Sequence, residues 1–305
     1  MTSIAHDDPV VVIIGSGAGG GTMAYELTRN GVPCVLIEAG RHFSVDDWEN
    51  DEWAAFGQMA WLDMRTTSGS YRITKDFPNL PAWIVKAVGG TTTHWSGATP
   101  RFMAHEWKAR THYGDIEGAN LLDWPIDGDE MAPWYDKAEI AIGSTHRHGR
   151  PALPANNNYK VFANGAERAG YRYYATGPYG TNAEPYDGRP ASIQDGFNFQ
   201  GDKNRSKWST LVREIPRALE TGKLDLRPEC HATRITHDAT GKVDGVEYLD
   251  ASGNLHKQAA RVVCLAGNSI ESPRLLLLSA SSQHPDGLAS SSGQVGRNDT
   301  RREIG

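Results

Sequence analysis

Three glycines and one acid near the start of the chain have the spacing of a nucleotide-binding turn. The segment GSGAGG places Gly15, Gly17 and Gly20 directly after an apolar run, and Glu38 follows 18 positions after Gly20. Glycine at these positions permits a sharp turn, a close approach of backbone to a pyrophosphate, and tight packing of a helix on a sheet. A carboxylate at the end of the next strand accepts hydrogen bonds from ribose hydroxyls. The pattern predicts a dinucleotide site, with NAD and FAD as alternatives.

The elements on both sides of the turn must position these residues. The β-branched run Val10–Ile14 predicts a parallel strand buried on both faces, and the residues after Gly20 have helical spacing. Residues 33–37 predict a second strand that ends at Glu38. The phosphates of a ligand would then lie at the helix N-terminus, where free N–H groups and the macrodipole favour negative charge.

A second segment, VGGTTTHWSG, begins at Val88 and has neither helical nor strand periodicity. It is predicted to be a loop whose glycine backbone and hydroxyl side chains follow the surface of a larger ligand. A third segment predicts a strand over residues 261–266, a turn at Gly267-Asn268-Ser269, and a helix with Pro273 in its first turn.

Together, these three segments resemble the glucose–methanol–choline (GMC) family of flavoprotein oxidoreductases, in the branch of pyranose oxidases and bacterial FAD-dependent sugar dehydrogenases. The resemblance implies that the cofactor is FAD, that the GGTT residues run along it, and that Ala266 to Asn268 lie beside it. Thr93-His94-Trp95 reproduces a tripeptide whose histidine is bonded to the flavin in pyranose oxidases, whereas related dehydrogenases keep the His-Trp pair without the bond. The predicted cofactor-binding residues are Gly15, Gly17, Ala18, Gly20, Glu38, Gly89, Gly90, Thr91, Thr92, His94, Trp95, Ala266, Gly267 and Asn268.

The activity that the resemblance implies is oxidation of a CH–OH group of a sugar or related alcohol, by hydride transfer to FAD. The catalytic histidine of the family lies in a C-terminal third that has no match here, so none of the eleven histidines is assigned as the base. We therefore expect a truncated or frameshifted product. The alternatives are a non-catalytic FAD-binding remnant or subunit that needs a partner, and an NAD-dependent dehydrogenase.

Composition limits the classes of partner. The net charge of −6 and the lack of a basic stripe exclude nucleic acid, and no apolar run is long enough for a membrane span. A sugar or alcohol substrate and a small accessory or electron-transfer subunit are the predicted partners. The N-terminus has no leader pattern, which predicts a cytoplasmic protein, with periplasmic co-export by a partner as the alternative.

The chain has three cysteines, and we expect Cys34, Cys230 and Cys264 to be buried thiols. Relatives often carry cysteines, some of them iron–sulfur ligands, in the region that corresponds to residues 191–210. This chain has none there, so no metal is predicted.

The predicted fold is α/β, with a Rossmann-like FAD-binding domain that combines a parallel sheet and an antiparallel meander, plus a partial substrate domain. The FAD domain takes residues 1–125 and 206–298, the partial substrate domain with its loops 126–205, and an aberrant or disordered tail 299–305. Within these, we expect a cofactor-covering segment at 41–85, a helix capped by Asp127 or Asp129, and long loops over 143–200. A helix over 207–219 ended by Gly222 and an antiparallel meander over 223–263 complete the expectation.

Overall fold

A computed structural model describes residues 2–51, 85–194, 196 and 201–297. The chain divides into two compact units. Unit 1 is Met1–Trp95, Phe197–Lys203 and Ser209–Gly305, and unit 2 is Ser96–Gly196 and Asn204–Trp208. The predicted domain boundaries stay predictions. Most of the segment predicted to cover the cofactor, and the whole tail 299–305, lie outside the described residues.

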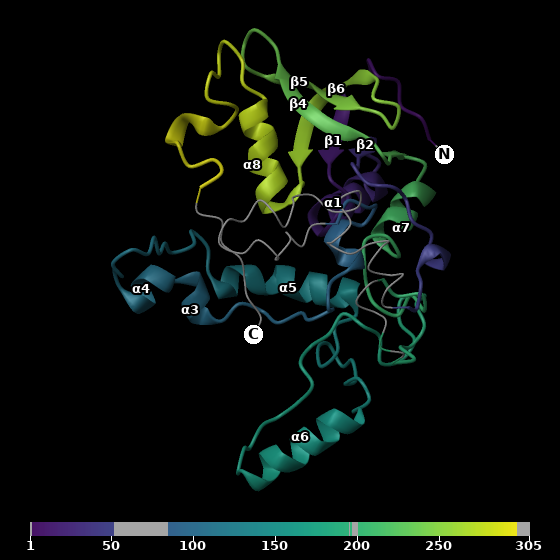
Figure 1. Ribbon diagram of the computed structural model, residues 1–305, viewed down its shortest axis with the longest axis vertical. Coiled ribbons are helices and arrows are strands. Elements are labelled where there is room, and N and C mark those ends of the chain that lie inside the picture. Colours follow the sequence, from purple (N-terminus) through teal and green to yellow (C-terminus); the bar gives the residue numbers. More distant parts are fainter. Residues whose placement is uncertain (1, 52–84, 195, 197–200, 298–305) are drawn as a thin grey trace. The chain divides into compact units, whose positions relative to one another are not determined.

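Unit 1 contains a six-stranded sheet in the order β3-β2-β1-β6-β5-β4 (Figure 1). The strands are β1 Val10–Ile14, β2 Cys34–Ile37, β3 Leu224–Arg227, β4 His231–His237, β5 Val243–Leu249 and β6 Leu255–Leu265. Parallel pairing joins β3, β2, β1 and β6, whereas β6, β5 and β4 pair antiparallel. The predicted combination of a Rossmann-like parallel sheet and a meander is confirmed.

Two strands differ from the prediction. The predicted strand 261–266 is the last part of β6, which pairs antiparallel with β5 from Leu255 to Ala259 and parallel with β1 from Ala260 to Leu265. The predicted meander 223–263 was wrong at its start, because β3 pairs parallel with β2. A parallel strand needs a crossover connection, and the helix that precedes β3 supplies it.

Three longer helices of unit 1 pack on this sheet: α1 Ala18–Arg29, α7 Glu214–Glu220 and α8 Asn268–Leu278. Ala24 of α1 and Ile215 of α7 are buried with Leu36 of β2 in one core cluster, whereas Leu275 of α8 is buried with Ile37 in the other. Figure 1 shows α8 beside β4 and α1 beside α7. The sheet is therefore covered on both faces, as its apolar strands predict. Short 3-10 helices occur at η1 Val45–Asp47, η2 Gly90–Thr93 and η4 Ser290–Ser292.

The predicted helix 207–219 begins only at Glu214. The preceding turn is held out of the helix because the amide and hydroxyl of Thr210 bond to two other loops, at Thr92 and Ser16. The helix ends at Glu220, and Gly222 follows with a φ of +67°, as the glycine predicts.

Unit 2 contains α3 Ala104–Trp107, α4 Ala109–Tyr113, α5 Gly128–Ile142 and α6 Asn157–Arg168. Asp127 caps α5 by accepting hydrogen bonds from the amides of Asp129 and Glu130, as predicted. The helix α6 corrects the prediction of continuous loops over 143–200. Its asparagines and glycine have low helix propensity, but the side chain of Asn156 caps its first turn through the amide of Tyr159.

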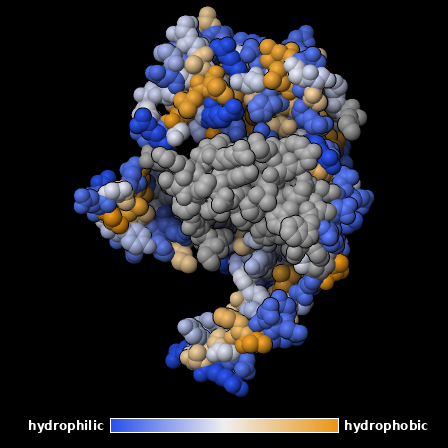
Figure 2. Space-filling view, viewed as in Figure 1, coloured by the Kyte–Doolittle hydropathy of each residue, from blue (hydrophilic) through white to orange (hydrophobic). Residues whose placement is uncertain are grey.

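The surface of α6 mixes polar and apolar groups. Figure 2 shows apolar patches on this part of unit 2, where Val161 and Phe162 are exposed. Among the helices that the structure describes, none combines the length and apolar character that crossing a membrane requires.

Candidate dinucleotide site

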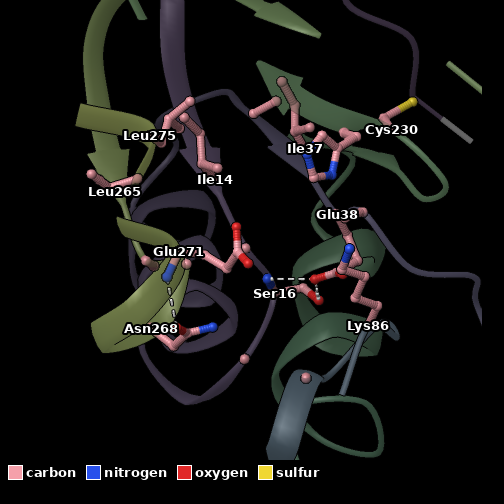
Figure 3. A pocket seen from close by; sticks show the side chains of 18 of the residues that line it. Ile14, Ser16, Ile37, Glu38, Lys86, Cys230, Leu265, Asn268, Glu271 and Leu275 are labelled. Atoms are coloured by element: carbon pink, nitrogen blue, oxygen red, sulfur yellow. Dashed lines mark hydrogen bonds between the residues drawn. The ribbon is translucent and has the colours of Figure 1, made fainter. Parts of the chain in front are cut away.

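A pocket lies in unit 1 at the carboxyl ends of β1, β2 and β6 (Figure 3). Ligands of open parallel sheets bind at this edge. The pocket is lined by Ile14, Gly15, Ser16, Gly17, Ile37, Glu38, Ala39, Val85, Lys86, Gly90, Thr91, Cys230, His231, Ala232, Leu265, Ala266, Gly267, Asn268, Glu271, Arg274 and Leu275. The three predicted segments, far apart in sequence, thus contribute to one pocket.

The glycine turn after β1 is shaped by close backbone contacts. Gly15 has a φ of +92°, and a Cβ there would lie 2.6 Å from the carbonyl oxygen of Ala266. A Cβ on Gly20 would lie 1.8 Å from the carbonyl oxygen of Gly15. The helix α1 begins at Ala18 with Gly17 as its N-cap and no side-chain cap. Its first-turn N–H groups therefore remain available for an anion in the pocket.

The second glycine segment contacts the first through backbone. Gly90 has a φ of +52°, and a Cβ there would lie 2.9 Å from the Cα of Gly17. The segment was predicted to be a loop and is the 3-10 helix η2, because Thr92 and Thr93 hydroxyls donate to the carbonyls of Gly89 and Gly90 at 2.5 and 2.8 Å. The two glycine segments therefore meet backbone to backbone at Gly17 and Gly90.

Glu38 is buried at the end of β2 and bonded to the glycine turn (Figure 3). Its Oε2 accepts from the amide of Ser16 at 3.0 Å and from the Ser16 hydroxyl at 2.6 Å, and its Oε1 accepts from the amide of Gly40 at 2.8 Å. Burial raises the pKa of Glu38, and these hydrogen bonds, together with the charge of Lys86, oppose the rise. A carboxylate offers about four acceptor positions, so one remains for a ribose hydroxyl.

The third predicted segment forms the opposite wall. Ala266, Gly267 and Asn268 line the pocket at the end of β6. Asn268 has a φ of +80°, and its Oδ1 accepts from the amides of Ile270 and Glu271 at 2.8 and 3.0 Å. Its side chain thus caps the start of α8 beside the pocket.

The sequence analysis did not predict one further segment of the pocket lining. Cys230, His231 and Ala232 line the pocket because the turn after β3 passes the end of β2, where the amide of Cys230 donates to the carbonyl of Glu38 at 2.9 Å. Burial lowers the pKa of His231, as does the nearby charge of Lys86, so its imidazole is neutral at pH 7. The missed signal was the short turn after residue 227, which returns the chain to the same edge of the sheet.

Six of the predicted residues do not belong to the described lining: Ala18, Gly20, Gly89, Thr92, His94 and Trp95. Gly20 and Gly89 permit close packing next to the lining. A Cβ on Gly20 would lie 1.8 Å from the carbonyl oxygen of Gly15, and a Cβ on Gly89 would lie 2.9 Å from the Cβ of Leu211. His94 ends η2 with 1% of its surface exposed, and its amide donates to Thr91. Its contact with a flavin stays a prediction.

A separate cluster in unit 2 joins Asp136, Glu139 and His148, whose ligand-type atoms lie within 4.8 Å of one another. The guanidinium of Arg101 donates to both carboxylates, at 2.5 Å to Asp136 and at 2.7 and 2.5 Å to Glu139. Arg147 lies 3.5 Å from Glu139 as well. The cluster is therefore an ion-pair network whose carboxylate oxygens are taken by cationic side chains.

The pocket fits a dinucleotide on two grounds. A side chain at Gly15 or Gly90 would collide with neighbouring backbone, and Gly17 leaves the start of α1 open to a phosphate. Glu38 adds a carboxylate to the lining at the end of β2, the kind of group that accepts hydrogen bonds from ribose hydroxyls.

The protein has a Rossmann-like α/β fold, with a pocket at the carboxyl edge of its parallel strands. A family model described as "GMC oxidoreductase" matches residues 3–301, so the chain belongs to the GMC oxidoreductase family. This confirms the predicted family.

Relatives with curated names include two alcohol or sugar dehydrogenases. The chain is 31% identical over 318 residues to 2-methyl-1,2-propanediol dehydrogenase of Mycolicibacterium austroafricanum, covering 97% of this chain and 55% of that protein. It is 28% identical over 325 residues to the fructose dehydrogenase large subunit of Gluconobacter japonicus, covering 94% and 57%. The chain therefore spans about half the length of the curated relatives it matches.

A solved structure shows the same fold. The crystal structure of pyridoxine 4-oxidase from "Mesorbium loti" matches with a TM-score of 0.58 and 17% identity, over 90% of this chain and 52% of that one.

Proposed function

We propose that the chain binds FAD in the pocket of unit 1 and serves an enzyme that oxidises a CH–OH group of a small alcohol or sugar. The observation that carries the proposal is the meeting of Gly17 and Gly90, backbone to backbone, beside the carboxylate of Glu38. The matching family is one of oxidoreductases, and the resemblance of the three segments to it implies that they contact FAD. Family membership therefore supports a flavin as the ligand.

Each part of the wall has a distinct task in this proposal. The first-turn amides of α1 bind the pyrophosphate, because they follow directly on the lining residue Gly17 and no side chain caps them. Glu38 accepts a ribose hydroxyl, and its negative charge disfavours a 2′-phosphate. The backbone at Gly90 and Thr91 continues the contact toward the flavin, with Ala266 to Asn268 on the other side. Bound FAD supplies a hydride acceptor for the oxidation.

The proposed substrate class rests on the relatives. One is named for a propanediol and another for fructose, and both are dehydrogenases of hydroxyl-bearing compounds. The second relative is a large subunit, which supports the proposal of an accessory subunit for this chain. A cytoplasmic compartment, with periplasmic co-export as the alternative, stays a prediction.

Reconstitution tests the proposal. The purified chain is incubated with FAD, NAD or ADP and passed through a desalting column, and the retained ligand is read from the flavin absorption bands and by chromatography. Retention of FAD, with ADP competing and NAD failing to compete, supports the proposal. A folded chain that retains NAD and no flavin points to the nicotinamide-dependent alternative.

Turnover is measured separately on the FAD-loaded chain, with propanediols, ketoses, aldoses and polyols and an artificial electron acceptor. Turnover supports the oxidoreductase role of this chain. Retained FAD without turnover supports a flavin-binding subunit that requires a partner.

A further inference from the structure

Thr210 is a buried residue that the proposed site does not yet explain. It is fully buried in the turn before α7, and it does not belong to the described lining of the pocket. It lies 118 positions after Thr92 and 194 positions after Ser16. A third distant segment therefore reaches the back of both glycine loops.

The hydrogen bonds of Thr210 join these two loops, and their donors and acceptors are mutually compatible. Its hydroxyl donates to the carbonyl oxygen of Ser16 at 2.9 Å, and its amide donates to the hydroxyl oxygen of Thr92 at 3.2 Å. The Thr92 hydroxyl donates in turn to the carbonyl of Gly89 at 2.5 Å. Each hydroxyl thus donates once, and each loop is bonded to the same threonine.

A second connection lies nearer to the pocket. The amide of Gly89 donates to the Ser16 hydroxyl at 2.9 Å, and that hydroxyl donates to Glu38 at 2.6 Å. A continuous series of hydrogen bonds therefore joins the second glycine segment, the glycine turn and the Glu38 carboxylate. Thr210 bonds to the same two loops from outside the pocket lining.

Glycines in α1 and in the second segment make room for this turn. A Cβ on Gly21 would lie 2.6 Å from the Cβ of Thr210 and 2.8 Å from its Cγ2. A Cβ on Gly89 would lie 2.9 Å from the Cβ of Leu211. Gly21 is outside the dinucleotide fingerprint, which ends at Gly20, so its presence is explained by the approach of Thr210 rather than by the ligand.

We propose that Thr210 is a positioning residue that holds the Ser16 and Gly89–Thr92 backbones at the separation required by the bound dinucleotide. The inference rests on the proposed function, because it concerns the same pocket. It adds a residue that acts through the two loops and touches no ligand. Loss of its hydroxyl leaves the carbonyl of Ser16 without this donor, while the amide of Thr210 still bonds to Thr92. The glycine turn at Ser16 is then no longer tied through Thr210 to the second glycine segment.

The test compares Thr210→Val with Thr210→Ser. Valine keeps the shape and removes the hydroxyl, whereas serine keeps the hydroxyl and removes only the methyl group. The matched control is Thr28→Val, because Thr28 is also buried and its hydroxyl also donates to a carbonyl, that of Ala24 at 2.7 Å, within α1. For each full-length chain, the Kd of FAD and the Kd of ADP are measured by titration, and the thermal midpoint is measured without ligand.

We expect Thr210→Val to weaken FAD binding at least tenfold, and Thr210→Ser to stay within threefold of the unaltered chain. The control is expected to lower the thermal midpoint without changing the Kd of FAD. Equal FAD affinity in Thr210→Val and the unaltered chain overturns the proposal, as does an equal loss in the control. If Thr210→Val fails to fold, Thr92→Val removes the acceptor of the Thr210 amide, which is the other link to this residue, and is held to the same tenfold criterion.

Hydrogen exchange of the ligand-free proteins separates this inference from the proposed function. Thr210→Val is expected to raise amide exchange at least threefold in the peptide covering residues 14–20, with Thr210→Ser close to the unaltered chain. A smaller rise is expected over residues 87–93, because the amide of Thr210 still bonds to Thr92 in this variant. If the unaltered chain binds no FAD, the proposed function fails, but the exchange result still decides the positioning role. Unchanged exchange in both peptides overturns it.

Discussion

Ser16 donates two hydrogen bonds to the same carboxylate oxygen of Glu38, from its amide at 3.0 Å and from its hydroxyl at 2.6 Å. The acid proposed to meet the ribose therefore also fixes the glycine turn that meets the pyrophosphate. Because the carboxylate is buried, its three chain-derived hydrogen bonds, including the one from Gly40, stabilise the turn before any ligand binds.

Glu38→Gln is expected to lower the free energy of unfolding of the ligand-free chain by about 1–3 kcal/mol, because an amide supplies fewer acceptor positions to the same donors. Urea unfolding measures the change. Glu26→Gln is the control, since Glu26 forms a surface pair with Arg29 at 2.6 Å and such pairs contribute about 0–1 kcal/mol. Similar losses in both variants would contradict the role given to Glu38.

Gly90→Ala is expected to weaken FAD binding at least tenfold, because its Cβ would lie 2.9 Å from the Cα of Gly17 and would push the two glycine segments apart. The control is Gly222→Ala, where φ is +67° and a Cβ would meet no atom within 4 Å. Both variants carry the strain of a left-handed alanine, about 1–2 kcal/mol. Isothermal titration with FAD distinguishes the two variants. An unaltered Kd of FAD in Gly90→Ala would argue against close packing of the two glycine segments at Gly17 and Gly90.

Cys230 provides a chemical test of the pocket. Cys230 belongs to the lining, whereas Cys34 is fully buried with a pKa raised by burial to about 11. Burial raises the pKa of Cys230 and Cys264 as well, so we expect slow alkylation of all three near pH 8. Saturating ADP is expected to slow the labelling of Cys230 at least fivefold and to leave that of Cys264 unchanged. Mass spectrometry of peptides gives the rates, and equal protection of both thiols would exclude a local effect.

The lowered pKa of Glu139 predicts that unit 2 loses stability at acid pH. Burial alone raises its pKa, but hydrogen bonds from Arg101 and His148 and the charges of Arg101 and Arg147 bring it below the ordinary value of 4.5. A lowered folded pKa means that the stabilisation is present above pH 4.5 and is lost as the pH falls further.

Glu139→Gln is therefore expected to lower the free energy of unfolding by about 1–3 kcal/mol at pH 7, with a shallower fall in stability below pH 4.5. Urea unfolding from pH 3 to 7 measures both effects. Asp136→Asn is the control, since Asp136 is half exposed and contributes about 1 kcal/mol or less. An unchanged acid slope in Glu139→Gln would remove Glu139 as the cause.

The sequence predicted those parts of the fold and site whose signal is local. Apolar strand, glycine turn, helix and acid follow one another within 30 residues, and β1, α1 and Glu38 lie where that order requires. The cap of α5 by Asp127 was predictable for the same reason, because the acid stands next to the amides it binds.

Features that depend on distant partners were not predictable. The start of α7 was misplaced because Thr210 bonds to Ser16 and Thr92 rather than continuing a helix. The parallel pairing of β3 with β2 depends on a crossover, and the wall at Cys230 and His231 depends on that pairing. Neither this strand pairing nor this part of the lining produces a periodic pattern of apolar residues in the sequence.

The position of β6 sets a requirement for synthesis in the cell. Ile14 of β1 pairs with Leu265 of β6, 251 positions later (265 − 14). While the ribosome produces the intervening chain, β1 has an open edge on one side, and such an edge invites pairing with other nascent strands. The pocket between β1 and β6 is therefore completed only after Leu265 has left the ribosome.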